Sequence, residues 1–124
     1  MDLLPRIPAD RQVINAYGDG GFRISGTHWT QSVLVFPGAT LPWGIASIAE
    51  LSVASLESAF DPDLGIELLL LGCGPSMVFI KKDLRADIRA RGLVIETLDT
   101  GAACRTYNLL MGEGRRVAAG LIPV

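Results

Sequence analysis

The segment from Ile66 to Leu71, Ile-Glu-Leu-Leu-Leu-Leu, constrains the fold more than any other part of the chain. A nearly continuous apolar run of this length is typical of a strand that is covered on both faces of a sheet. The elements expected after it alternate between helix and strand: a helix over 83–91, a strand over 93–98, a helix from 100 to about 111, and a strand over 116–122. Such alternation implies right-handed crossover connections. We therefore predict an α/β domain with a largely parallel core sheet, in which 66–71 and 93–98 are adjacent central strands.

Local signals support the helix over 83–91. Leu84 and Ile88 lie on one face of it, and Asp87 and Arg91 have the i, i+4 spacing of an exposed ion pair. Gly92 stands where a helix commonly ends in a left-handed residue. The sequence therefore predicts an amphipathic helix that packs on the sheet.

The first half of the chain predicts β structure. Residues 12–17 and 22–27 flank Gly18-Asp19-Gly20-Gly21, which suits the tight turn of a hairpin. A strand over 30–36 is β-branched and ends before Pro37-Gly38. We expect the hairpin to pack at one side of the core sheet.

Between these halves, residues 41–45 predict a short strand or coil with Trp43 as an anchor. A helix is expected over 52–60, with Ser52 as its N-cap and with Leu51 and Leu56 at the positions of a hydrophobic staple. Asp61-Pro62 ends it.

The composition bounds the class of protein. At 124 residues, with 49% apolar and 19% charged residues, the chain predicts a single domain (1–124) with a substantial core, whose first segment (1–11) is extended or flexible. The net charge is −2, and only Lys81-Lys82 and Arg115-Arg116 are locally basic, which disfavours nucleic acid as a partner.

The same sequence gives little sign of export, membrane insertion or metal binding. The N-terminus lacks a signal-peptide pattern, and the longest apolar stretch, 68–74, is far shorter than a membrane span needs. Two cysteines are too few for a zinc framework. We expect a cytoplasmic protein that does not span a membrane and uses neither a metal nor a cofactor.

The loop Gly72-Cys73-Gly74-Pro75-Ser76 follows the buried strand, so phosphate binding by Gly72 and Gly74 is one hypothesis for it. The loop lacks the full glycine pattern and the lysine of nucleotide-binding loops, and Pro75 removes a backbone donor. A tight exit from the strand is the interpretation that the sequence favours.

The segment Thr100-Gly-Ala-Ala-Cys104 begins the last helix with small residues, and Thr100 or Asp99 caps it. The free N–H groups there could hold an anion, and the helix dipole would lower the pKa of the Cys104 thiol. Cys73 and Cys104 both follow strands at the edge where α/β proteins place their sites. A thiol pair or a reactive Cys104 is therefore a hypothesis, while reduced, buried cysteines that act as small apolar groups are the commoner case.

Arg105 and Asn108 share one face of the same helix and could clamp a carboxylate or phosphate, with Trp43 and Tyr107 as supporting contacts. An equally good interpretation is a polar face that packs against loops. The residue types alone leave both interpretations open.

A catalytic constellation is hard to assemble from this sequence. His28 is the single histidine, no nucleophile motif accompanies it, and Asp61 and Asp63 belong to a turn around Pro62. We name no catalytic residue and expect His28 to be structural.

The run from Asp99 to Asn108, followed by Glu113, Arg115 and Arg116, resembles a small family of uncharacterised bacterial and archaeal proteins. That family includes a mitochondrial respiratory complex I assembly factor and an adipogenesis-associated relative. The likeness extends from the Pro37…Trp43 stretch through Gly72-Cys-Gly74 to Pro123.

This resemblance implies a three-layer α/β fold around a mixed sheet whose last strand is antiparallel. It implies no established catalytic residue or cofactor. It further implies a non-enzymatic accessory or assembly role through protein contacts, with a respiratory or membrane-complex subunit or another assembly factor as partner. The rival is a small-anion or nucleotide-binding protein, or a thiol-dependent enzyme, that uses the Gly72–Ser76 loop and the Thr100–Cys104 helix start.

Overall fold

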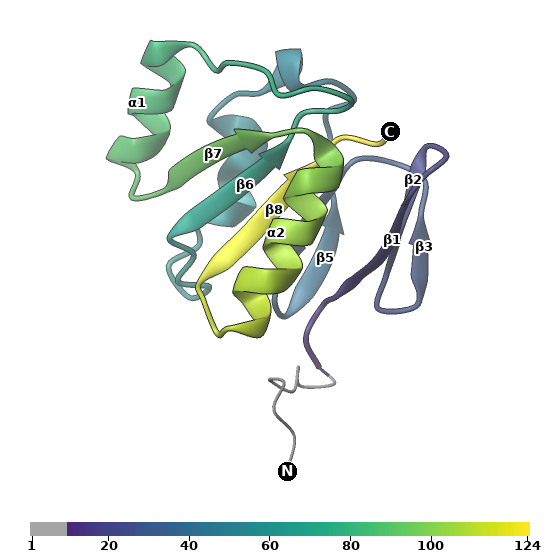
Figure 1. The fold of residues 1–124 in the computed structure, drawn as a ribbon. Helices are drawn as coiled ribbons and strands as arrows, with labels where there is room; N and C mark the ends of the chain where they lie inside the picture. The colour runs from purple at the N-terminus through teal and green to yellow at the C-terminus, as the bar shows by residue number, and fades with distance from the viewer. Residues whose placement is uncertain (1–9) are drawn as a thin grey trace.

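A computed structural model describes residues 10–124. The predicted extended segment 1–11 therefore lies almost wholly outside the described residues. The larger of two sheets has five strands, in the order β5-β4-β8-β6-β7 (Figure 1). Its members are β4 (Val33–Phe36), β5 (Ala39–Pro42), β6 (Leu68–Gly72), β7 (Val94–Leu98) and β8 (Val117–Leu121).

This sheet is mixed and not mostly parallel. β6 pairs in parallel with both β7 and β8, whereas β4 pairs antiparallel with β8 and with β5. The prediction that the strands at 66–71 and 93–98 are adjacent and parallel is confirmed. The prediction that both are central is wrong for β7, which lies at the edge. The last strand is also not the antiparallel one, because β8 runs with β6 and it is β4 that runs against β8.

The smaller sheet contains the predicted hairpin and one strand more. β1 (Ile14–Gly18) and β2 (Gly21–Ile24) pair antiparallel, and β3 (Thr27–Trp29) adds to β2. Asp19 and Gly20 both have positive φ values, 52° and 78°, as a tight hairpin turn requires. A second such pair, Ser25 and Gly26, makes the turn into β3.

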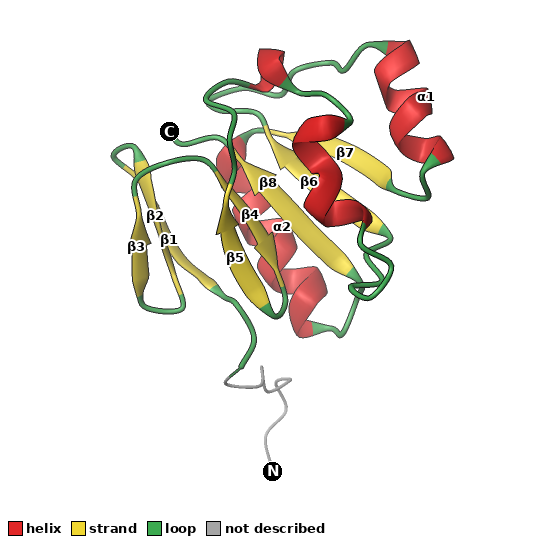
Figure 2. Cartoon of the chain, turned by 180° about the vertical axis from the view of Figure 1, so that it is seen from behind, coloured by secondary structure: helices red, strands yellow, loops and turns green. Residues whose placement is uncertain are grey.

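Helices cover both faces of the large sheet, which gives three layers (Figure 2). On one face lie the 3₁₀ helices η1 (Ile48–Glu50) and η2 (Ala54–Phe60), while α1 (Lys82–Ala90) lies beside β7. On the other face lie α2 (Thr100–Gly112) and, beyond it, the small sheet (Figure 1). The buried residues accordingly form two clusters, one on each side of the sheet.

The helical segments differ from prediction in detail. The helix expected over 52–60 is 3₁₀ and begins at Ala54 without a side-chain cap, while Ser52 accepts a hydrogen bond from the Ser55 N–H. A capping box stands instead at η1, where Ser47 accepts from the Ala49 N–H and Glu50 accepts from the Ser47 N–H.

In α1, Ile88 is buried and Leu84 packs against the core as expected. The expected pair of Asp87 with Arg91 is wrong. Arg91 instead pairs with Glu57 at 3.2 Å and stacks over the Phe60 ring at 4.2 Å, because η2 passes close to the end of α1.

β8 alternates between the two core clusters. Val117, Ala119 and Leu121 face α2, while Ala118 faces the 3₁₀ helices. Gly120 lies beneath the Trp43 ring, because a Cβ there would approach two ring carbons at 2.9 Å. Trp43, predicted as an anchor, is buried and donates its indole N–H to the Ser55 carbonyl at 2.8 Å. The absence of a side chain at Gly120 thus lets the tryptophan reach the centre of the sheet.

We expect Gly120→Ala to destabilise the fold by about 1–3 kcal/mol, because the added methyl would overlap the Trp43 ring and force it to move. The melting temperature should fall by roughly 4 °C per kcal/mol at this chain length. Gly38→Ala is the control, since a Cβ at Gly38 would meet nothing within 4 Å. Equal melting temperatures for the two variants in thermal denaturation would contradict this packing argument.

Candidate functional site

The residues predicted for the carboxyl edge of the sheet do come together, but they bond to one another. The Thr100 hydroxyl donates to the Ile122 carbonyl at 2.7 Å and accepts from the Gly74 N–H at 2.9 Å. The Thr100 N–H donates to the Gly74 carbonyl at 2.9 Å. Thr100 is fully buried. The loop after β6, the start of α2 and the end of β8 are therefore tied at one side chain.

Gly72 is held by close approach to the same residue. A Cβ at Gly72 would lie 2.9 Å from a Leu121 methyl and 3.0 Å from the Thr100 Cα. Gly74 has a φ of +107°, a backbone conformation that favours glycine. Both glycines thus have a packing or conformational reason to be glycine, as the tight-exit interpretation expects.

The donors at the start of α2 are largely used within the chain. Asp99 is the cap, and its carboxylate accepts from the Ala102 N–H at 2.9 Å while its carbonyl accepts from the Ala103 N–H. With the Thr100 N–H bonded to Gly74, three of the first N–H groups of the helix have partners. Such a helix start offers few free donors for an anion.

Cys73 and Cys104 are both buried, as predicted. They belong to the core clusters on opposite faces of the sheet, so the structure does not bring them together as a thiol pair. Burial raises the pKa of the Cys104 thiol from about 9 to about 12, and the nearby Arg105 charge only partly opposes this. The direction is opposite to the lowering expected from the helix dipole.

Asn108 forms a two-point bond to the backbone of β1. Its side-chain oxygen accepts from the Ile14 N–H at 2.9 Å, and its side-chain nitrogen donates to the Ile14 carbonyl at 2.8 Å. The amide therefore pairs with Ile14 as a neighbouring strand residue would. This is the packing interpretation of the polar face of α2, reached across 94 residues of chain.

Tyr107 and Arg105 also contact the first strand and its approach. Tyr107 is fully buried and donates its hydroxyl to the Gln12 carbonyl at 2.9 Å, and burial raises the pKa of that hydroxyl. Arg105 is exposed and donates to the Tyr17 hydroxyl, whose ring lies against Gly101. Among the candidate residues, Arg105 is thus the charged one, and it is exposed to solvent.

Two features escaped the sequence analysis. Tyr17 is a partner of Arg105, and no local pattern indicates this pairing of β1 with α2. Met77, Val78 and Phe79 are exposed apolar residues in the loop before α1. Three consecutive apolar residues after Gly74-Pro75-Ser76, without helix or strand periodicity, are the signal that could have marked them.

His28 lies exposed in β3, opposite Arg23 of β2. Within residues 10–124, no three histidine, cysteine, aspartate or glutamate side chains cluster as metal ligands. Over the same residues, none of the helices combines the length and the apolar character that crossing a bilayer requires.

Together these contacts define a small three-layer α/β domain whose polar residues at the sheet edge and on α2 bond mainly within the protein. Residues 14–122 match the family model described as "Protein of unknown function (DUF498/DUF598)", and the chain belongs to that family.

Named relatives extend the likeness. An uncharacterised protein of Rhodobacter capsulatus is 34% identical over 98% of this chain and 94% of its own length. The zebrafish (Danio rerio) protein named NADH dehydrogenase [ubiquinone] 1 alpha subcomplex assembly factor 3 is 36% identical over 90% of this chain. The match spans 64% of that relative's length.

A solved structure agrees with the fold. The crystal structure of a Bordetella parapertussis protein superimposes with a TM-score of 0.83 at 31% identity, covering 92% of this chain and 97% of that one. The arrangement of both sheets and their helices is therefore shared with an experimental structure in the same size range.

We expect Asn108→Ala to lower the free energy of unfolding by about 1–3 kcal/mol, because it leaves the N–H and carbonyl of Ile14 without their partners. Arg105→Ala should cost only about 0.5 kcal/mol, since its bond to Tyr17 is exposed. Denaturant unfolding of both variants measures this. A larger loss for Arg105→Ala than for Asn108→Ala would contradict the assignment.

The thiols should be unreactive in the folded protein. With a pKa of about 12, Cys104 carries almost no thiolate near neutral pH, and Cys73 is buried. A thiol reagent should label either residue only as fast as the protein unfolds, with a denatured sample as control. Rapid labelling of folded Cys104 would revive the thiol hypothesis.

The same shift predicts a pH dependence of stability. The folded-state pKa of Cys104 lies above its unfolded value. The contribution of its neutral thiol to the free energy of unfolding is therefore complete below about pH 9 and is lost as the pH rises toward 12. The free energy of unfolding should therefore fall across that alkaline range, and less steeply in Cys104→Ala than in the unmodified protein.

Proposed function

We propose that this protein is a non-enzymatic accessory factor that binds a protein and helps assemble a respiratory NADH dehydrogenase. The proposal depends on one observation: over 90% of its length, the chain is 36% identical to a protein named as an assembly factor for that enzyme. The partner would be a subunit of the enzyme or another assembly factor. We propose the cytoplasm as the compartment in which it acts.

The geometry of the candidate site supports a binding role over a chemical one. The polar groups of Thr100, Asn108 and Tyr107 form hydrogen bonds with the backbone. Cys104 is held as a neutral thiol at physiological pH. Thr100, at the centre of the rival's site, is thus already bonded within the fold, whereas Arg105 remains exposed.

Deleting the gene from the organism that encodes the chain should reduce the amount of assembled NADH dehydrogenase in its membranes. Native gels and NADH oxidation by isolated membranes measure the loss, and re-expression of the chain should restore it. Succinate oxidation serves as the control for a general respiratory defect. An unchanged enzyme level would overturn the proposal.

The rival hypothesis can be tested on the purified protein. A thermal-shift screen of nucleotides and small anionic metabolites should give no large shift if the protein acts through a protein partner. A reproducible large shift with one metabolite, removed by Thr100→Ala, would favour the rival.

A further inference from the structure

The loop that joins β6 to α1 carries an exposed apolar surface. Met77, Val78 and Phe79 are 44%, 40% and 85% exposed. The side chain that follows, Ile80, packs against the core, as does Leu84 in α1. The core therefore holds the end of the loop that leads into α1, and the three exposed apolar side chains come just before this end.

A groove lies directly beside these side chains. It has a volume of about 340 Å³ and is bounded by η1 on one side and by the loop and the start of α1 on the other, with Ile48, Leu51, Val78, Phe79, Ile80 and Leu84 in its lining. Its walls are thus mostly apolar. A space of this size and character accepts an apolar side chain from another molecule.

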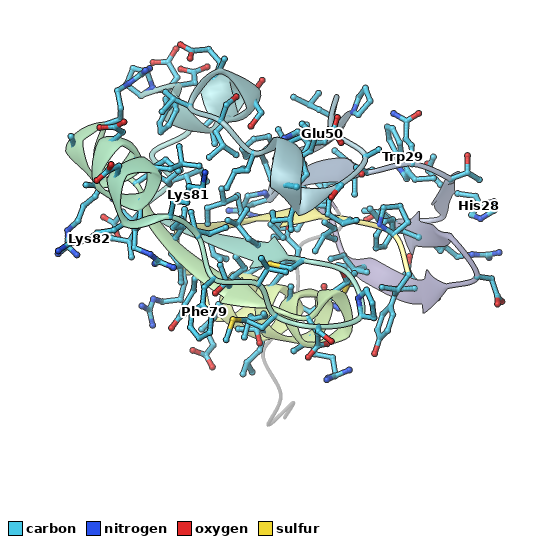
Figure 3. All side chains as sticks on the ribbon, turned by 90° about the horizontal axis from the view of Figure 1, so that it is seen from above. His28, Trp29, Glu50, Phe79, Lys81 and Lys82 are labelled. Carbon is cyan, nitrogen blue, oxygen red and sulfur yellow. The ribbon has the colours of Figure 1, made fainter. Side chains whose placement is uncertain are left out.

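The rim of the groove is positively charged. Lys81 lines it and Lys82 follows at the first position of α1; both are exposed, and neither forms an ion pair with any of residues 10–124. Figure 3 shows Phe79, Lys81 and Lys82 on one side of the molecule, far from His28 and Trp29. Glu50, on the η1 side, already accepts from the Ala46 and Ser47 N–H groups. Among the described residues that line the groove, Lys81 is the charged one, and Lys82 is its neighbour in sequence, with the carboxylate of Asp83 following in the first turn of α1.

We propose that this surface, formed by Met77–Lys82 and η1, is the docking site for a protein segment with an apolar anchor flanked by carboxylates. The anchor enters the groove beside Phe79, and the carboxylates meet Lys81 and Lys82. Exposed aromatic residues next to apolar pockets are common centres of binding energy, and complementary charge supplies specificity. The inference rests on the proposed function and names the surface and the chemistry of the partner.

Two other occupants fit the observations less well. A membrane surface would need a broader basic face than two lysines followed directly by Asp83, and a flat bilayer would not fill a groove. A two-fold dimer through this same surface would bring Lys81 and Lys82 of one copy near the same two lysines of the other, which like-charge repulsion opposes.

A peptide library displayed on phage and selected on the purified protein tests the proposal. The selected peptides should share an apolar residue flanked by Asp or Glu. Phe79→Ala should weaken the binding of a selected peptide about tenfold or more. Leu109→Ala is the matched control, since Leu109 is 62% exposed on α2 and outside the groove, and it should leave binding unchanged.

A charge-reversal variant, Lys81→Glu with Lys82→Glu, provides a second readout. Acidic residues are favourable at a helix start, so this variant should fold. Selection on it should yield peptides with Lys or Arg in place of Asp or Glu. A merely structural effect of the lysines would weaken binding without changing which charge is selected.

Several results would overturn the proposal. These are selected peptides without acidic residues, binding that Phe79→Ala does not affect, Phe79-dependent sedimentation with vesicles of phosphatidylcholine and phosphatidylglycerol, or a dimer in solution that Phe79→Ala dissociates. The two proposals fail separately. If gene deletion lowers NADH dehydrogenase and Phe79→Ala restores it fully, the assembly role stands and this docking site does not. If deletion leaves the enzyme level unchanged while acidic peptides still bind through Phe79, the docking site stands and the proposed function does not.

Discussion

The narrow central strand β8 is the constraint on which the rest of the structure depends. It is hydrogen-bonded on both sides, antiparallel to β4 and parallel to β6, and all five of its residues are buried. Its middle residues, Ala118, Ala119 and Gly120, are small. α2 can therefore approach one face closely (Figure 1). Trp43 lies on the other face, over Gly120. Larger side chains at these positions would push both layers away from the sheet.

The close approach of α2 explains what its polar face does. α2 and the small sheet lie side by side on the same face of the large sheet, so one flank of the helix meets the small sheet, whose strands do not pair with the large one. Asn108 and Tyr107 supply the hydrogen bonds between α2 and the backbone of Ile14 and Gln12. A buried backbone group needs a partner, and here side chains of a helix provide it. Asn108, which with Arg105 was the candidate ligand clamp, thus attaches α2 to the small sheet.

The sequence predicted the elements better than their arrangement. The apolar run at 66–71 and the amphipathic pattern at 83–91 report local burial, and both elements formed close to the expected bounds. Strand order is a property of the whole sheet: nothing in 93–98 itself shows that β7 has only one neighbour. The antiparallel direction of β4 and the third strand of the small sheet likewise depend on pairings outside their own segments.

The candidate site shows the same division. The order of elements placed the Gly72–Ser76 loop and the Thr100–Cys104 segment after strands at one edge of a parallel sheet, and in the structure Thr100 bonds to Gly74 there. That order could not show that the polar groups of these two segments would form their hydrogen bonds with one another and leave few for a ligand. The amide of Asn108 has the same donors and acceptors for a ligand as for the backbone of Ile14, so only the fold decides between them. For Cys104, burial in the core outweighs the helix dipole, and burial depends on the whole packing.

The edges of the large sheet narrow the ways in which a partner could bind. On β7, backbone groups of Val94 and Leu98 bond toward β6, so the backbone N–H and carbonyl of Ile95 point to the open edge of the sheet. Arg85 of α1 donates to that carbonyl at 3.0 Å. On β5, Pro42 offers no N–H. Both edges are thus partly closed to an added strand, a common protection against unwanted pairing. Among the described residues, a partner can instead contact exposed side chains. Those of the apolar loop before α1 lie at the carboxyl edge of the sheet, where polar groups are already bonded to one another. A partner that binds there would be recognised by shape and charge and not by extension of the sheet.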